Sequence, residues 1–350
     1  MKTKIYLSAI ATFISLLSFA QPGSLDETFG RGGKATPVFG QYGSEAEGVA
    51  IQTDKKLIVV GKQFNAANNE FEVIRFNSDG SLDKTFGTKG NVHTLISGTC
   101  GARSVAIQPD GKIVVVGTCS DFTTPSMAVA RYNEDGTLDS DFNGTGTAII
   151  SFGNSYAEAY SLVIQPDGKI VIGGDIRDAE DGDILKFALA RLKADGTIDD
   201  NFGNHGKVVS GFNGKHAYAY KILLQADNKI IAAGTIRNTN DDDFAVIRYK
   251  ANGNIDESFG TTGKLIADFG GDDGGTAAAL QSDGKIIVAG VSSISFVYSF
   301  AMIRYKKNGT PDNSFGTNGK ATNDFGGVIS SIGDRIGIAI QADSKILLAG

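Results

Sequence analysis

The chain has 350 residues, a formal net charge of −6, 46 glycines, 6 prolines, 2 cysteines and no tryptophan. A hydrophobic fraction of 41% supports a packed core and excludes global disorder. No basic run is longer than two residues, so nothing in the sequence indicates a groove for nucleic acid or binding to an anionic membrane surface.

The first twenty residues (1–20) have the pattern of an export signal. Two lysines precede the apolar run Ile5–Phe19, and small residues stand at Ser18 and Ala20. This pattern predicts a cleavable signal peptide, a cut before Gln21, and a secreted or cell-surface protein. An uncleaved membrane anchor is the alternative, but 15 residues are short for a span of about 20. No later segment is apolar for long enough, so we expect no membrane span in the mature chain.

Residues 21–350 consist of one repeat. Motifs of the type "IQPDGKIVVVG", "FALARL" and "LD..FG" recur in order, with periods of 56 to 60 residues. The repeated glutamines are Gln52, Gln108, Gln165, Gln225, Gln281 and Gln341. Such a period predicts a repeat architecture, with copies that start near residues 23, 80, 136, 196, 253 and 309.

Each period contains four strand signals and no helical one. In the second copy they are Asn91–Ile96, Ser104–Gln108, Lys112–Gly117 and Ala128–Tyr132. The dipeptide Asp110-Gly111 predicts a two-residue type I′ hairpin turn between the middle two strands. We expect the long link after the "FEVIRF"-type strand to run from an outer strand back to the inner strand of the next copy.

Four antiparallel strands joined by hairpins predict an all-β fold, a β-propeller whose blades bury their faces against one another. A β-solenoid is the alternative, but its coils are usually shorter and need no hairpin turns. The unbroken period predicts a single ring without a domain boundary over Gly23–Gly350. The last copy stops after its "ILLAG" strand, so we expect an incomplete last blade, an exposed sheet edge and a native protein that continues further.

The motifs "QPDGK", "FALARL" and "LD..FG..GK" together resemble the delta-60 repeat, a β-propeller-like repeat of exported bacterial proteins. The resemblance covers about Gly23 to Gly350. It implies a secreted repeat protein without a general catalytic activity. The first copy departs from the pattern, since Asp54-Lys55 stands where the turn prefers Asp-Gly.

A residue that recurs in every copy is expected to serve the blade itself. We predict that the repeated arginine pairs with the repeated aspartate of its own or the adjacent copy, and that losing one partner costs about 3–5 kcal/mol. The arginines are Arg75, Arg131, Arg191, Arg248 and Arg304; the aspartates are Asp26, Asp83, Asp139, Asp199, Asp256 and Asp312. The alternative is a basic ring that binds a polyanion. The phenylalanine of "LD..FG" is expected to wedge between blades.

Function is expected where the copies differ. Two variable loops are acidic, and they contain Asp178, Glu180, Asp181 and Asp183, and Asp241, Asp242 and Asp243. We interpret them as solvated surface loops. The alternative is a cation site, and calcium is the cofactor that such a site would bind. The equivalent loop of the fifth copy offers Phe296 and Tyr298 as apolar binding contacts.

No residue is assigned a catalytic role, because the three histidines show neither metal spacing nor a partner nucleophile. The predicted function is therefore an exported, non-catalytic module for binding, adhesion or surface scaffolding, whose partner is an extracellular protein or a glycan. The alternative is a secreted polysaccharide-active enzyme with its site at the mouth of the ring.

Cys100 and Cys119 are the only cysteines, and export favours their oxidation. A turn at Asp110-Gly111 would place them two positions from direct opposition, about 7–8 Å apart at Cα. We predict a disulfide after a small adjustment, which would contribute about 3 kcal/mol. Two unpaired thiols are the alternative.

Overall fold

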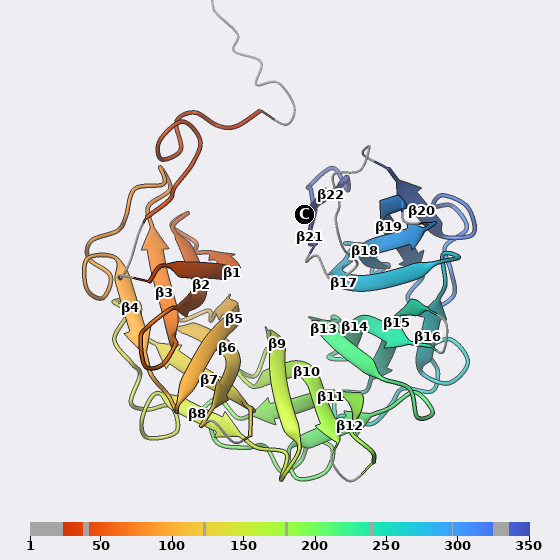
Figure 1. Ribbon diagram of the computed structural model, residues 1–350, viewed down its shortest axis with the longest axis horizontal. Helices are drawn as coiled ribbons and strands as arrows, with labels where there is room; N and C mark the ends of the chain where they lie inside the picture. Colours follow the sequence, from red (N-terminus) through yellow and green to blue (C-terminus); the bar gives the residue numbers. More distant parts are fainter. Residues whose placement is uncertain are drawn as a thin grey trace, which may run out of the picture.

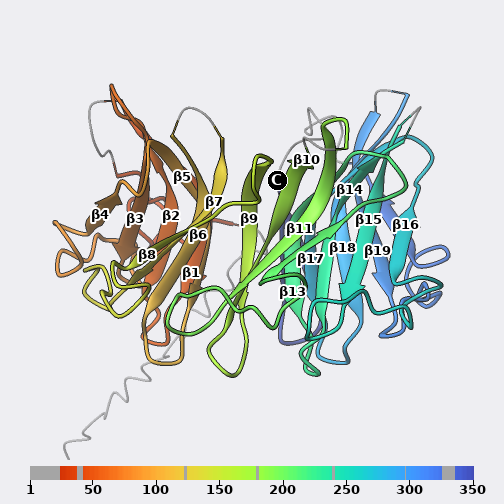
Figure 2. The ribbon, with the colours of Figure 1, turned by 90° about the horizontal axis from the view of Figure 1, so that it is seen from below.

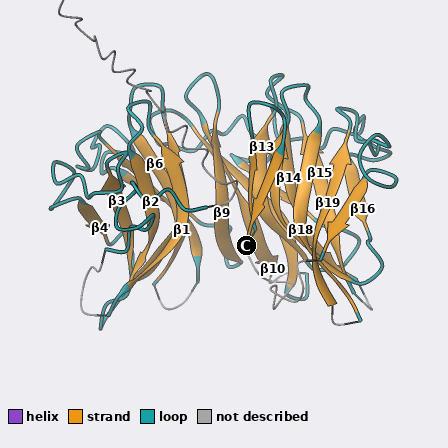
Figure 3. Cartoon of the chain, turned by 90° about the horizontal axis from the view of Figure 1, so that it is seen from above, coloured by secondary structure: helices purple, strands orange, loops and turns teal. Residues whose placement is uncertain are grey.

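The computed structural model describes residues 24–37, 42–121, 124–178, 181–238, 241–295, 297–324 and 336–350. In these residues every regular element is a β-strand, and Figure 3 shows no helix. The described part of the chain accordingly has no helix long and apolar enough to cross a membrane.

The strands form six antiparallel sheets, which we call blades. The innermost strands are β1 (Ser44–Ile51), β5 (Thr99–Ile107), β9 (Tyr156–Ile164), β13 (Ala217–Leu224), β17 (Asp272–Leu280) and β21 (Gly337–Ile340). The second strands are β2 (Leu57–Gln63), β6 (Ile113–Ser120), β10 (Ile170–Asp178), β14 (Ile230–Arg237), β18 (Ile286–Ile294) and β22 (Ile346–Ala349). The third strands are β3 (Glu70–Phe76), β7 (Ser126–Tyr132), β11 (Ile184–Leu192), β15 (Asp242–Tyr249) and β19 (Val297–Tyr305). The fourth strands are β4 (Asn91–Thr94), β8 (Thr147–Ile150), β12 (Lys207–Ser210), β16 (Lys264–Ala267) and β20 (Lys320–Asn323).

The blades stand around one central axis, as Figure 1 shows, with the first strand of each blade innermost and the fourth outermost. Figure 2 shows the same blades side by side from below. Five blades have four strands, the sixth has two in the described residues, and the ring is open between the sixth and the first. The predicted all-β propeller of four-stranded blades is confirmed.

The long link lies within one blade, so the expected crossover from one copy to the next is wrong. Its strand Asn91–Thr94 pairs with β3 of the same sheet, with Ile74 opposite Asn91. The link folds back because Asp83 N donates to Arg75 O (2.9 Å) and Arg75 N donates to Gly90 O (3.0 Å). The first five blades are instead joined by the short segment between the fourth strand of one blade and the first strand of the next.

The hairpin turn is also different from the predicted type I′ turn. Gln108 N donates to Lys112 O (2.8 Å) and Gly111 N to Gln108 O (2.9 Å), so three residues form the loop. Only its last residue has a positive φ, 84° at Gly111. A type I turn followed by one left-handed residue meets this geometry. The loop therefore needs only one residue with a positive φ, and in the first copy Lys55 occupies that place with a φ of 68°.

The hydrophobic core is divided among the junctions between consecutive blades. For example, one cluster joins Val116 and Val129 of the second blade to Ile170 and Ile172 of the third. The phenylalanines of the "LD..FG" motif lie in these junctions and are fully buried at Phe86, Phe142, Phe202 and Phe259. Phe29 and Phe315, at the two ends of the series, are only half-buried. Burial at the junctions is what lets a blade that cannot fold alone become stable.

The repeated arginine forms an ion pair with the aspartate eight residues later, in its own blade. The Nε–Oδ2 distances run from 2.6 to 2.9 Å for Arg75–Asp83, Arg131–Asp139, Arg191–Asp199, Arg248–Asp256 and Arg304–Asp312. Asp26 accepts hydrogen bonds from Thr28 instead. Each guanidinium lies 4.5–4.7 Å from the centre of the phenylalanine ring of its own motif.

These arginines also connect neighbouring blades. Arg131 donates to Ala194 O and Arg191 to Ala251 O, each in the following blade. The side chains of the Arg131 and Arg191 pairs are all less than 10% exposed. Buried groups whose hydrogen bonds go to the protein do not fit a surface that binds a polyanion.

Cys100 and Cys119 lie directly opposite each other, with Cα atoms 4.1 Å apart and sulfurs at a bonding distance of 2.13 Å. The expected diagonal register is therefore wrong. The three-residue turn shifts the pairing by one position, and an extra residue in β5 between Ala102 and Ser104 shifts it by one more. The structure contains the disulfide without the adjustment that the predicted register required.

Candidate ligand-binding site in the central channel

Each complete blade carries a one-residue β-bulge at the same place in its innermost strand. In β1, Ala46 pairs with Gly61 and Gly48 with Val60, which leaves Glu47 as the extra residue. The five extra residues, which we call the bulge residues, are Glu47, Arg103, Tyr160, Tyr220 and Thr276. A bulge redirects a side chain from the pleated sheet. Here all five side chains line the central channel.

The glycine that ends each "VVVG"-type run makes the bulge possible. A Cβ on Gly174 would lie 1.8 Å from Glu158 O, and one on Gly234 would lie 1.7 Å from Tyr218 O. Gly61, Gly117 and Gly290 face a carbonyl of the inner strand in the same way. The repeated glycine is therefore needed because the bulged backbone approaches it closely.

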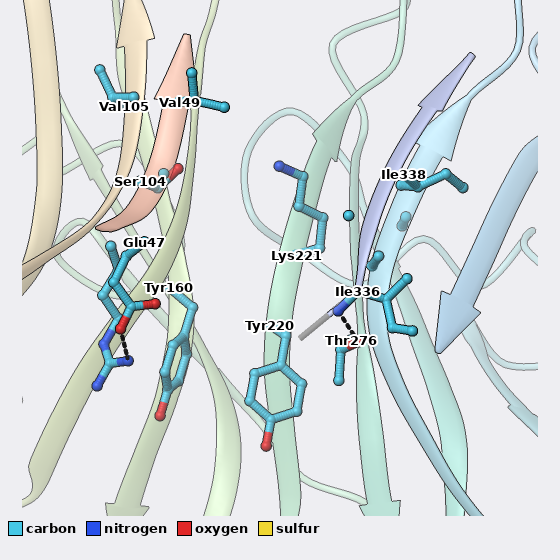
Figure 4. A pocket seen from close by; sticks show the side chains of 15 residues that line it. Glu47, Val49, Ser104, Val105, Tyr160, Tyr220, Lys221, Thr276, Ile336 and Ile338 are labelled. Carbon is cyan, nitrogen blue, oxygen red and sulfur yellow. Dashed lines mark hydrogen bonds and ion pairs between the residues drawn. The ribbon is translucent and has the colours of Figure 1, made fainter. Parts of the chain in front are cut away.

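The channel contains a cavity of about 320 Å³. Its walls come from the innermost strands of all six blades, β1, β5, β9, β13, β17 and β21, together with Ile336 just before β21. This volume lies at the lower end of the range of about 300–1,000 Å³ for small-molecule sites. Figure 4 shows Glu47 on one side, Ile336 and Ile338 on the other, and Tyr160 and Tyr220 between them.

A network of charges occupies one side of the cavity. Arg103 lies between Glu47 and Glu158, with N–O distances of 3.6 Å to each, and its guanidinium lies 5.0 Å from the centre of the Tyr160 ring. The Tyr160 hydroxyl donates to Glu158 Oε2 (2.6 Å). Burial and then the neighbouring carboxyls of Asp175 and Glu158 raise the pKa of Tyr160, so its hydroxyl stays protonated. Arg103 is therefore already paired, with one carboxylate more than its single charge requires.

Behind this network lies Asp175, which is 4% exposed and pairs with Glu158 across β9 and β10. Burial, and then the charge of Glu158, raise the pKa of this carboxyl well above its usual range. Its Oδ1 has no hydrogen-bond partner in the described residues. Asp175 thus helps to set the electrostatics of the site without lining the cavity.

Three tyrosines form an aromatic wall. The rings of Tyr160 and Tyr220 meet edge to face with centroids 5.3 Å apart, and Tyr218 stacks on Tyr220 at 6.0 Å. Tyr160 and Tyr220 are half-buried, and in Figure 4 both hydroxyls point toward the same end of the channel. Aromatic rings with a polar tip suit ligands that have both apolar faces and hydroxyl groups.

Lys221 is the cation that the network does not balance. It follows Tyr220 and points into the cavity in Figure 4. The equivalent positions in other blades are small, for example Gly48, Ser104 and Ala277. Burial lowers the pKa of Lys221, and the described residues provide no ion-pair partner for it. A lone ammonium in a partly apolar cavity favours a ligand with a negative charge.

The predicted acidic loops do not meet in one site within the described residues. Asp181 pairs with Lys186 (2.7 Å) and Asp242 with Arg237 (3.0 Å), while Asp183 lies in a turn. Glu180 and the side chain of Asp178 lie outside the described residues. Asp241 is described, but it belongs to no group of carboxylates that could share a metal ion. Among the loop acids that the structure describes, only Asp243 joins other carboxylates, those of Asp268 and Asp273.

The predicted apolar contacts of the fifth copy are placed differently. Tyr298 is half-buried and packs against the core between the fifth and sixth blades, and Phe296 lies outside the described residues. The channel residues were not predicted, although a signal was available. The residue five positions before each repeated glutamine is different in nearly every copy: Glu47, Arg103, Tyr160, Tyr220, Thr276 and Ile336.

Comparison with family models gives one decisive match. The family described as "Domain of unknown function (DUF5122) beta-propeller" matches residues 52–86, 108–142, 165–202, 225–259 and 281–315, slightly more than half of the chain. The chain belongs to this family. Each match to the DUF5122 β-propeller runs from a repeated glutamine to the phenylalanine of the "LD..FG" motif, so it covers the repeated framework and leaves out the bulge residues.

A search of curated proteins finds no match. Among solved structures, the DUF5122 chain is similar to a glucose dehydrogenase with 13% identity, a TM-score of 0.46, and coverage of 89% of this chain and 95% of that one. A catalytically inactive virginiamycin B lyase from Staphylococcus aureus has 12% identity and a TM-score of 0.46, with coverage of 89% of this chain and 94% of that one. A gluconolactonase from Xanthomonas campestris has 11% identity and a TM-score of 0.44, with coverage of 88% of this chain and 83% of that one. Similarities at this level carry no argument about activity.

Proposed function

We propose that this DUF5122 β-propeller is an exported binding module that holds a carboxylated sugar in its central channel. Lys221 carries the proposal, because it points into the cavity without an ionic partner in the described residues. A ligand carboxylate would supply the missing negative charge, and the Tyr160 and Tyr220 rings would contact the faces of the sugar. Export itself is proposed from the signal-peptide pattern of residues 1–20.

The electrostatics favour an anionic ligand over a neutral one. Arg103 already contacts two carboxylates, Glu47 and Glu158, whereas Lys221 contributes a positive charge on the opposite wall that forms no ion pair in the described residues. A neutral ligand would leave the ammonium desolvated and unpaired, which costs free energy. The carboxylate of a charged ligand would pair with the Lys221 ammonium, and this pairing would contribute to the binding free energy.

The test is calorimetric titration of the mature protein with trigalacturonic acid and, as a matched neutral probe, with galactotriose. Trigalacturonic acid is expected to bind and galactotriose to bind at least about tenfold more weakly. Lys221→Met should weaken trigalacturonate binding about thirtyfold or more, since losing one partner of a buried charge pair costs about 2–5 kcal/mol. Lys193→Met, at an exposed turn, is the control and should change nothing. Equal binding of both probes contradicts the proposal.

A second candidate, a polysaccharide-active enzyme, is favoured by one observation. Unlike polar side chains of four blades, Glu47, Arg103, Tyr160 and Lys221, meet at the same cavity. An amine with a lowered pKa next to tyrosine hydroxyls could move a proton during bond cleavage. Prolonged incubation with polygalacturonate distinguishes the two, because the binding module leaves the polymer length unchanged.

A further inference from the structure

One position in the innermost hairpin differs sharply between blades. Blade two has the pair Cys100–Cys119 there, and blades three and four have alanine opposite isoleucine. Blade five has Asp273 opposite Ser292, which are 0% and 2% exposed. Since Ala157 and Ala217 fill the same position elsewhere, the fold does not require a carboxylate at Asp273.

Two further carboxylates converge on Asp273 from the fourth blade. Asp243 begins the buried part of β15 and is 5% exposed, while Asp268 follows β16 and is exposed. The three side chains can each offer an oxygen such that all three oxygens lie within 4.8 Å of one another. Three negative groups this close, two of them buried, repel one another unless a positive charge lies between them.

In the described residues no lysine or arginine forms an ion pair with these carboxylates, although Lys320 Nζ donates to the backbone oxygen of Asp268. Oδ1 of Asp243 and Oδ1 of Asp273 are buried without a hydrogen-bond partner, and the Ser292 hydroxyl lies beside Asp273 without the geometry of a full hydrogen bond. The other oxygens accept bonds from Asn238 Nδ2 and from Phe269 N (2.5 Å). The nearby Lys215 donates to Asn238 rather than to a carboxylate.

The electrostatics agree with this geometry. Burial, followed by the neighbouring carboxylates, raises the pKa of Asp243. Burial likewise raises the pKa of Asp273 to about 6, although the Ser292 hydroxyl and Phe269 N lower it in part. Orphaned buried oxygens in a cluster that opens to the surface through Asp268 are the arrangement expected of a cation site.

We propose that Asp243, Asp268 and Asp273 bind a calcium ion at the junction between the fourth and fifth blades. The donors are all oxygens, which hard divalent cations prefer. Opposite ligands of Ca²⁺ lie about twice the Ca²⁺–oxygen distance of about 2.3–2.6 Å apart, so oxygens within 4.8 Å can share one ion. The Ser292 hydroxyl and water complete the coordination. This site is independent of the channel, and of the loop acids Asp181 and Asp183.

The experiment uses the full mature chain, stripped with EDTA and titrated with CaCl₂ by calorimetry, with thermal unfolding measured in parallel. The protein is expected to bind one Ca²⁺ per chain and to melt at a higher temperature in CaCl₂ than in EDTA. Asp273→Ala restores the alanine of blades three and four, so it should fold. It should lose at least about tenfold in Ca²⁺ affinity and show no Ca²⁺-dependent shift in melting temperature.

Asp243→Asn is the second variant, since it keeps the shape of the side chain, and the same loss is expected. Asp181→Asn, an acidic residue of an exposed loop, is the matched control and should keep the affinity of the unmodified protein. The proposal is overturned if the unmodified protein shows no saturable Ca²⁺ binding, or if Asp273→Ala binds Ca²⁺ as tightly as the control.

Discussion

The outer half of each blade keeps the same residues from copy to copy, whereas the innermost strand has a position whose residue differs between copies. Around the long link, each of five blades uses the same three groups, such as Arg131, Asp139 and Phe142, with nearly the same distances. At the bulge, each of the five complete blades uses the same backbone geometry, but the side chains are acidic, basic, aromatic or hydroxylic. Blades must stack alike, which fixes the first set of residues. The bulge residues face the channel rather than a blade junction, so the stacking of the blades does not fix their identity.

This comparison gives a rule for the whole molecule. A residue that recurs at one position stabilises a blade junction, and a residue that differs at a position with the same backbone is a candidate for function. Arg191 and Lys221 illustrate the two kinds of cation: the first is paired and bound to the next blade, and the second points into the cavity without an ionic partner in the described residues. The predictions below test the two halves of this rule.

The largest loss of stability is expected from breaking the repeated ion pair of the third blade, for which the described residues provide no second cation. Arg191→Leu leaves Asp199 buried, and should lower the free energy of unfolding by about 3–5 kcal/mol in urea titrations. Arg131→Leu should cost less, because Lys112 also contacts Asp139 at 2.8 Å. A loss below about 1 kcal/mol for Arg191→Leu would show that the pair is not a structural requirement.

Adding a Cβ to the glycine opposite a bulge is expected to lower the free energy of unfolding by about 3 kcal/mol. In Gly174→Ala the new Cβ would meet Glu158 O at 1.8 Å, so the bulged backbone that directs Tyr160 into the channel must move. Gly101→Ala is the control, because its Cβ would meet only Lys62 Cδ at 3.5 Å. Urea unfolding compares them, and equal stability of the two variants would contradict the account of the repeated glycine.

The disulfide of the second blade is expected to contribute about 3 kcal/mol, since its cysteines are 19 residues apart. Replacing Cys100 by alanine and Cys119 by isoleucine reproduces the pair Ala157–Ile176 of the third blade, so packing is kept and only the cross-link is removed. Thermal unfolding measures the loss. The unreduced, denatured protein should show no free thiol, and two thiols would disprove the bond.

A smaller effect is expected from acid. Burial alone would raise the pKa of Asp256, but Ser258, Arg248 and Lys229 together lower it to about 2. A carboxyl with a lowered pKa in the folded state stabilises the fold above its unfolded pKa of about 3.9. That stability is lost as the pH falls from about 4 toward 2. Asp256→Asn should therefore show a shallower loss of melting temperature over this range, and an unchanged acid limb would argue against the pair.

The sequence was sufficient for the parts that repeat. The period, the all-β character and the pairing of the repeated arginine with a repeated aspartate follow from residues that recur at fixed spacing, although the blade to which Asn91–Thr94 belongs did not. It was not sufficient for the bulges, because Glu47 and Thr276 share no chemistry and only the pairing of both strands reveals that they are equivalent. The turn failed for a related reason, since Asp110-Gly111 fits both a two-residue and a three-residue loop. The Asp243, Asp268 and Asp273 cluster spans two blades, and spacing along one copy does not show it.

The most direct measurement of the central claim is a crystal structure of the mature protein with trigalacturonic acid. The claim is that ligands bind where the bulge residues meet. The account predicts one ligand in the channel, with a carboxylate within hydrogen-bonding distance of Lys221 Nζ and a sugar face against Tyr160 or Tyr220. A ligand bound instead at the outer loops, beside Tyr298 or Asp181, with the channel left empty, would contradict it.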